Sequence, residues 1–277
     1  MGTARLAAVA AILSLAAPAA DPDWRRELER WRQEREAKLT AEDGWLAVAG
    51  LVWLREGENR VERFGVVELR NGRVTLRVDG GAMVTVDGRP AREVDMKPDS
   101  PGPATVARAG DRSLNVIRRG GRYGVRLKDK NSKFRREFAG LRWFPADEAY
   151  RVNAKLVRHG RPSTIQIANI LGQTEPRTSP GYVVFQLGGR ERRLEPVLED
   201  SGELFFVFKD PTSRQETYQA GRFLYVPMPP GAELTLDFNK AHNPPCAFNP
   251  YTTCPLPPRQ NHLTVPVRAG EKRYEAK

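Results

Sequence analysis

Short hydrophobic runs separated by turn signals fill most of the chain from residue 46 onward. The clearest pair covers residues 66–70 and 73–78, which flank Asn71-Gly72. Both residues of this dipeptide tolerate positive φ, so it is typical of a two-residue type I′ hairpin turn. Helical patterns do not alternate with the strands, which argues against a parallel sheet. This succession of short hydrophobic runs and turns therefore predicts a mainly β protein built from antiparallel strands.

The strands fall into two groups. Residues 114–117 and 125–127 form a second hairpin, and about seven short strands are expected before residue 130. Later runs predict strands at 150–156, 163–168, 182–187, 203–208, 223–226, 233–238 and 262–268. Pro266 makes the last of these an edge strand or a bulge. We expect two halves of antiparallel strands, each resembling a β-sandwich or barrel.

One amphipathic helix is predicted ahead of the strands. Trp24, Leu28, Trp31 and Arg35 recur at helical spacing and share a face, and Asp23 can cap the helix start. We expect this face to dock on the protein's own β core; a partner or a membrane surface is the alternative.

The first residues have the pattern of an export signal. A positive start with Arg5 precedes the apolar run Leu6–Ala16, and Ala17-Pro18-Ala19 supplies small residues before a cleavage site. The apolar run is too short to span a bilayer as a helix. We therefore expect an exported protein that is periplasmic or secreted, with an uncleaved anchor as the alternative.

These boundaries predict four segments. They are a signal peptide (1–19), an N-terminal helix (20–44), an N-terminal β half (45–133) and a C-terminal β half (134–277) that carries a Pro-rich Cys loop (237–258).

The chain is basic, with a formal net charge of +11 at pH 7. Acidic residues interrupt the basic ones along its whole length, and no nucleic-acid motif accompanies them, so nucleic acid is not an expected partner. A small-molecule or envelope-polymer ligand is expected instead, together with peripheral attraction to anionic surfaces.

The segment 237–258 is unusual in composition. It holds both cysteines of the chain, six prolines and three asparagines. The prolines fix φ and remove backbone donors, so the segment is expected to be a rigid irregular loop. Such loops often present binding or catalytic groups.

The two cysteines allow three interpretations. In an exported protein, Cys246 and Cys254 are expected to form a disulfide. Free thiols are an alternative, and so is a metal site that adds His242 and His262, although the spacing matches no standard zinc pattern. We predict no metal and no cofactor.

The loop and two other segments supply side chains suited to binding an anionic or sugar-like ligand. Amide and carboxylate groups hydrogen-bond hydroxyls, and cationic groups clamp carboxylates or phosphates. The predicted ligand-binding residues are Arg151, Arg222, Asp237, Asn239, Lys240, Asn243 and Tyr251. Each of them also has a plain structural interpretation, since Asn before Pro is ordinary turn chemistry.

Established catalytic motifs are missing from the sequence, which contains no G-x-S-x-G, H-E-x-x-H, P-loop or G-x-G-x-x-G pattern. An alternative function is a hydrolase of envelope material in which Asp237 works with Glu216 or Glu195 as an acid–base pair. A structural scaffold is a third hypothesis.

Several segments resemble a known family. They are residues 45–59 (WLAVAGLVWLREGEN), 138–145 (FAGLRWFP), 150–152, 220–225, the Pro-rich loop and 269–274 (AGEKRY). Together they resemble domain-of-unknown-function family 1684, whose proteins often carry export signals, over residues 39–274. His242 departs from that pattern, in which a tyrosine is expected. The resemblance implies no activity.

Overall fold

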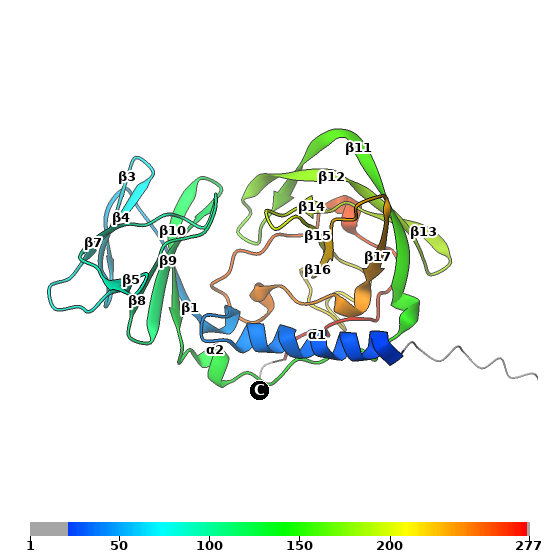
Figure 1. Ribbon diagram of the computed structural model, residues 1–277, viewed down its shortest axis with the longest axis horizontal. Helices are drawn as coiled ribbons and strands as arrows, with labels where there is room; N and C mark the ends of the chain where they lie inside the picture. The colour runs from blue at the N-terminus through cyan, green and yellow to red at the C-terminus, as the bar shows by residue number, and fades with distance from the viewer. Residues whose placement is uncertain (1–21, 276–277) are drawn as a thin grey trace, which may run out of the picture.

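The computed structural model describes residues 22–275, and the predicted signal peptide at 1–19 lies outside them (Figure 1). The predicted fold class is confirmed: four antiparallel sheets form two halves, and one long helix precedes them. Within residues 22–275, no helix combines the length and apolar character that crossing a bilayer requires.

The N-terminal half contains two sheets. One has six strands in the order β1 (Val48–Trp53), β10 (Arg122–Asp129), β9 (Arg112–Arg119), β8 (Val106–Ala109), β5 (Thr85–Val86) and β6 (Arg89–Pro90). The other has four, in the order β2 (Gly57–Val61), β3 (Gly65–Arg70), β4 (Arg73–Val78) and β7 (Glu93–Asp95). Fully buried Phe64, Leu76 and Leu114 belong to the core of this half. The half thus holds more strands than expected, because short pairs such as β5–β6 carry little hydrophobic pattern.

Both predicted hairpins of this half are confirmed. Asn71 and Gly72 join β3 to β4 with φ values of 49° and 79°. Gly120 and Gly121 join β9 to β10 in the same way, with φ of 53° and 78°. Positive φ at both central residues defines the type I′ geometry, whose twist matches that of the flanking strands.

The C-terminal half also contains two sheets. The first has the order β13 (Arg190–Leu194), β12 (Thr174–Leu187), β11 (Arg151–Ala168) and β17 (Glu233–Asp237). The second has the order β14 (Val197–Leu198), β15 (Glu203–Phe208) and β16 (Arg222–Pro227). Phe206, Phe208 and Phe238 are fully buried in the core shared by these sheets.

Two strand predictions for this half are wrong. The separate strands expected at 150–156 and 163–168 are one strand, β11, whose pairing with β12 is irregular between Arg158 and Ser163. The stretch 262–268 forms no strand, although it lies among the described residues, and only an isolated bridge joins His262 to Lys209. Pro266 removes a donor in the middle of that stretch, which disfavours a ladder.

Short helical turns connect these sheets. They are α2 (Lys133–Arg136) and the 3₁₀ turns η1 (Trp45–Ala47), η2 (Glu148–Tyr150), η3 (Phe238–Lys240), η4 (Pro245–Ala247) and η5 (Arg259–Asn261). Two of them, η3 and η4, lie inside the Pro-rich loop and confirm that it is neither a regular strand nor a long helix.

The long helix α1 (Pro22–Thr40) runs along the base of the C-terminal half (Figure 1). Its predicted inner face is confirmed: Trp24 and Leu28 are buried, and Trp31 meets the ring of Trp143 edge-on at 5.8 Å between centroids. The helix begins at Pro22, two residues before Trp24, so Asp23 lies in its first turn and is not the cap. Residues 22–40 therefore dock on the protein's own core.

Replacing Leu28 with Ala should lower the free energy of unfolding by about 2–5 kcal/mol, because a fully buried side chain is removed and leaves a cavity. Chemical denaturation measures this change. Glu34→Ala, on the exposed face of the same helix, is the matched control and should change stability by less than about 0.5 kcal/mol. Equal losses in the two variants would show that the inner face does not stabilise the fold.

Candidate functional site

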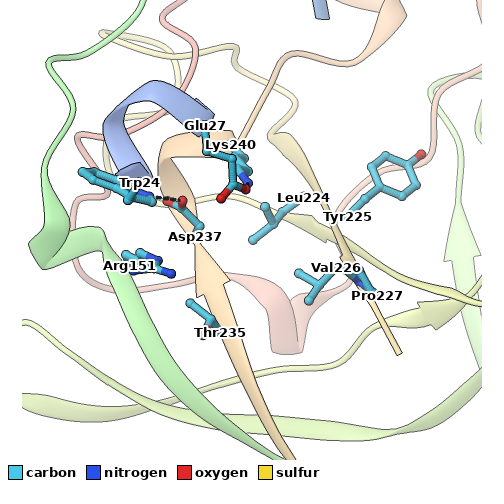
Figure 2. A pocket seen from close by; sticks show the side chains of 10 residues that line it. All are labelled: Trp24, Glu27, Arg151, Leu224, Tyr225, Val226, Pro227, Thr235, Asp237 and Lys240. Atoms are coloured by element: carbon cyan, nitrogen blue, oxygen red, sulfur yellow. Dashed lines mark hydrogen bonds and ion pairs between the residues drawn. The ribbon is translucent and has the colours of Figure 1, made fainter. Parts of the chain in front are cut away.

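A pocket of about 220 Å³ opens where the first turns of α1 meet β16, β17 and the start of β11 (Figure 2). Four chain segments that are far apart in sequence supply its walls. The lining residues are Trp24, Glu27, Arg151, Leu224, Tyr225, Val226, Pro227, Thr235, Asp237 and Lys240. Three predicted ligand-binding residues, Arg151, Asp237 and Lys240, are therefore brought together.

Strand pairing explains how two of these residues meet. β11 and β17 are antiparallel, and Arg151 at the start of one is the register partner of Asp237 at the end of the other. Lys240 follows three residues later, at the end of η3. Local turn geometry and sheet register thus place two cationic side chains at one edge of the C-terminal half.

The charges of the pocket are unevenly matched. Lys240 Nζ lies 2.8 Å from Glu27 Oε1, and this hydrogen-bonded ion pair holds the pKa of Glu27 below its usual value, with help from the charge of Arg151. The guanidinium of Arg151 is exposed and has no hydrogen-bond or ion-pair partner among the described residues. A cationic group thus remains available to a ligand.

Asp237 is a structural anchor of the pocket. Its side chain is buried, and its Oδ1 accepts hydrogen bonds from the backbone N–H and the side-chain amide of Asn239, at 3.0 and 2.9 Å. Its Oδ2 accepts one from the indole Nε1 of Trp24 at 2.8 Å. Both oxygens are therefore engaged, in capping η3 and in holding the start of α1.

This arrangement does not support the carboxylate-pair hydrolase. Glu216 is paired with Arg268, with its two carboxylate oxygens 3.0 and 3.1 Å from Arg268 Nε. Glu195 accepts from Gln260 at 3.0 Å and lies 3.3 Å from the ring of His159. Neither glutamate lines the pocket with Asp237. No acid–base pair of the expected kind therefore forms at this pocket.

The opposite wall of the pocket is largely apolar. Leu224 and Val226 of β16 are buried. Tyr225 and Pro227, which alternate with them along the strand, are exposed. Figure 2 shows Arg151 on one side of the pocket and Tyr225, Val226 and Pro227 on the other. Tyr225 is held by stacking on Phe205, with 4.5 Å between ring centroids. One wall of the pocket is thus charged, and the wall opposite it is largely apolar.

Arg222, which was predicted to bind ligand, lies inside the core instead. Its Nη2 is 2.9 Å from Asp210 Oδ2, and its guanidinium also donates to the carbonyl oxygens of Val267 and Ala269. Its side chain is 1% exposed and the carboxylate of Asp210 fully buried, so no ligand can reach the pair. Arg222 joins β16 to the C-terminal segment.

The amide predictions also turn out to be structural. Asn239 is fully buried; its Nδ2 donates to Asp147 O at 2.9 Å, and its Oδ1 accepts from Asp147 N at 3.0 Å. Asn243 is buried too, and its Nδ2 donates to Lys272 O at 2.8 Å. Tyr251 packs edge-on against Phe134 and does not line the pocket. These residues shape the loop, and their side chains are engaged by other parts of the chain.

Sequence reasoning missed most of the pocket walls. Trp24 was expected on the buried face of the helix, which is correct, but its indole also reaches Asp237. Glu27 gave no signal, because an exposed helical glutamate looks like any solvated charge. The alternation in β16 indicated a strand without indicating that its outer side chains border a pocket.

The two cysteines are free thiols that lie side by side in the loop. The backbone N–H of Cys246 donates to Cys254 Sγ at 3.2 Å, and that of Cys254 donates to Cys246 Sγ at 3.3 Å. The disulfide expected between them stays a prediction. Across residues 22–275, no cluster of three or more His, Cys, Asp and Glu side chains suits a metal ion.

His242 sits among aromatic rings. It stacks on Tyr225 at 5.9 Å between centroids, and Trp31 and Phe223 lie at 5.9 and 6.2 Å. Its Nδ1 carries a proton, because it lies 3.1 Å from the carbonyl oxygen of Lys240, which only accepts. Burial, aided by the charge of Arg35, lowers the pKa of His242 to about 3. The ring therefore stays neutral over the physiological range.

Comparison with known proteins adds a family and no activity. A family model described as "Protein of unknown function (DUF1684)" matches residues 136–272. An uncharacterised protein of Haloarcula marismortui, whose structure was solved by NMR in solution, is 34% identical; the match covers 50% of this chain and 78% of that one, with a TM-score of 0.42. No curated protein matches the chain.

The neutral His242 predicts a specific pH dependence. Its folded-state pKa of about 3 lies below its ordinary value of 6.5, so the unfolded chain binds the proton first and stability falls as the pH drops below 6.5. His242→Tyr keeps an aromatic ring without this titration. Between pH 6.5 and 4.5 the variant should lose less free energy of unfolding than the wild type, by on the order of 2 kcal/mol.

Chemical denaturation at a series of pH values measures that difference. Leu28→Ala is the control, because it removes a fully buried side chain that carries no titratable group, so it should lower stability and leave the pH profile parallel to that of the wild type. If the free energy of unfolding of His242→Tyr and of the wild type changes in parallel with pH, protonation of His242 does not destabilise the fold.

Proposed function

We propose, for a chain that belongs to the DUF1684 family of proteins of unknown function, that the pocket between α1, β16 and β17 binds a small anionic, sugar-like ligand. The observation that carries this proposal is the guanidinium of Arg151, which borders the pocket and has no hydrogen-bond or ion-pair partner in the described part of the chain.

The hydrogen-bond pairing of the charged lining residues supports an anionic group on the ligand. Lys240 and Glu27 offset each other across 2.8 Å, and the carboxylate of Asp237 is already satisfied by Trp24 and Asn239. Arg151 is then the charged lining residue whose hydrogen-bond donors are left without a partner among the described residues. A guanidinium binds carboxylate or phosphate oxygens with two parallel hydrogen bonds.

The remaining surfaces suit the rest of a sugar. Glu27 and Thr235 offer oxygens to ligand hydroxyls, and the hydroxyl of Thr235 also donates. Leu224, Val226 and Pro227 face the C–H groups that line one side of a sugar ring. At about 220 Å³ the pocket is smaller than the roughly 300–1,000 Å³ of pockets for drug-sized ligands, which favours a single-ring ligand.

We propose further that the ligand is met outside the cytoplasm. The support is the export pattern of residues 1–19, in which an apolar stretch precedes Ala17-Pro18-Ala19. Envelope polymers there contain sugars that bear carboxylates and phosphates, so a sugar acid is the ligand class we favour.

Calorimetric titration with glucuronate tests the proposal, with glucose as the uncharged comparison. The wild-type protein should bind glucuronate and should bind glucose at least tenfold more weakly. Arg151→Gln removes a charged hydrogen-bond donor worth about 1.5–3 kcal/mol, so it should weaken glucuronate binding by about tenfold to a hundredfold.

Lys155→Gln is the matched control. It removes a positive charge from an exposed residue of the same strand, outside the pocket, and should leave glucuronate binding within a factor of two. If both variants weaken glucuronate binding equally, the effect comes from the overall charge of the protein and not from the pocket, which would contradict the proposal. A wild-type protein that binds neither glucuronate nor glucose 6-phosphate would also overturn it.

A further inference from the structure

The strongest feature outside the pocket is the pair of thiols in the Pro-rich loop. Cys246 lies in η4, and Cys254 lies eight residues later, beyond a turn fixed by prolines on both sides. Each backbone N–H donates to the sulfur of the other residue, at 3.2 and 3.3 Å. The backbone thus holds the two sulfurs against each other.

The two thiols have different environments. Cys246 is partly exposed, whereas Cys254 is 6% exposed and packs with Val197, Phe205, Val207 and Phe223. The hydroxyl of Thr252 donates to Cys246 Sγ at 2.9 Å, and this bond adds to the one from the Cys254 amide. Two donors therefore converge on one sulfur of the pair, that of the partly exposed residue.

A buried cation lies near the pair. Arg126, on β10 of the N-terminal half, is 6% exposed and lies over the ring of Trp45 at 5.0 Å. Its Nε has no hydrogen-bond partner among the described residues, and the carboxylate of Asp99 is 3.9 Å from its Nη1. Burial lowers the pKa of Arg126 to about 10, so it is charged at neutral pH. Its charge favours a thiolate at Cys246.

We propose that Cys246 and Cys254 form a redox-active dithiol that exchanges with small disulfides, with Cys246 as the nucleophile and Cys254 as the resolving thiol. Electrostatics agrees with the geometry. The hydrogen bond from the Cys254 thiol, the Thr252 hydroxyl and the charge of Arg126 lower the pKa of Cys246 to about 7, and burial raises the pKa of Cys254. A thiolate is the species that attacks a disulfide.

The exchange has two balanced steps. The Cys246 thiolate attacks one sulfur of a small disulfide, forms a mixed disulfide and releases the other sulfur as a thiolate. Cys254 then gives up its proton, attacks Cys246 Sγ and releases the second small thiol. The protein loses two electrons and two protons as its disulfide forms, and the small disulfide gains them as two thiols.

Reaction of the reduced full chain with 5,5′-dithiobis(2-nitrobenzoate) tests this assignment. The wild type should release two thionitrobenzoates per chain and keep no label, because Cys254 displaces the mixed disulfide. Cys254→Ser should release one and keep one label, as read by intact mass. Cys246→Ser should react at least tenfold more slowly than Cys254→Ser at pH 7, because the remaining thiol is buried and protonated.

The pH dependence adds an independent readout. The rate for wild type should be half-maximal near pH 7, below the value of roughly 8.5 of an ordinary thiol. Thr252→Val removes a donor to the Cys246 sulfur and should raise this midpoint by about one pH unit. Thr253→Val removes the neighbouring hydroxyl and should leave it unchanged.

Three outcomes would overturn the assignment. They are a label retained on both cysteines of the wild type, equal rates for Cys246→Ser and Cys254→Ser, and a wild-type midpoint at that of an ordinary thiol. The serine variants keep the size of each side chain, and circular dichroism confirms that they are folded before rates are compared.

Discussion

The carboxylate of Asp237 joins the parts of the chain on which the candidate site depends. It ends β17, caps η3 through Asn239 and accepts the indole N–H of Trp24, so sheet, loop and helix meet at one buried group. A buried carboxylate is costly unless its oxygens are hydrogen-bonded, and here both are. The pocket exists because α1 is held over the sheet edge at this point.

A second buried network holds the C-terminal segment. Arg35 of α1 lies 3.0 Å from Glu271 Oε1 and also donates to the carbonyl oxygen of Asn243, while Glu271 Oε2 accepts from the N–H of Asn243. Burial raises the pKa of Glu271, and Arg35 opposes that effect. Removing one member would leave a charge buried without its partner, which is more damaging than never having the pair. This network explains how a Pro-rich segment with few ladder bonds keeps one shape.

The sequence predicts what is local in this fold. The hairpin turns at residues 71–72 and 120–121, the inner face of α1 and the irregular loop follow from short-range chemistry, since turn residues and hydrophobic spacing act within a few positions. The continuity of β11 does not follow from short-range chemistry. Residues 158–163 have a turn-like composition, but pairing with β12 on both sides of them keeps β11 a single strand.

The candidate site was predictable only in part, for the same reason. Asp237 and Lys240 were identified because they belong to the unusual loop, and Arg151 because it is a cationic side chain on another segment; the register between β11 and β17, which the sequence did not give, brings them together. Arg222 looked equally suitable, but its partner Asp210 and the carbonyl oxygens that enclose it are fixed by packing between segments. Sequence spacing does not say whether an arginine meets solvent or a buried aspartate.

The position of Arg126 connects chemistry in one half of the molecule to packing between the halves. The guanidinium belongs to the N-terminal half, whereas the sulfurs on which its charge acts belong to the C-terminal half. Thermodynamic linkage makes such a relation reciprocal. For the proposed Cys246 thiolate, a looser contact between the halves would lower its stability, and formation of the thiolate would strengthen the contact. In the proposed dithiol, the state of the thiol pair and the packing of the two halves are therefore coupled through Arg126.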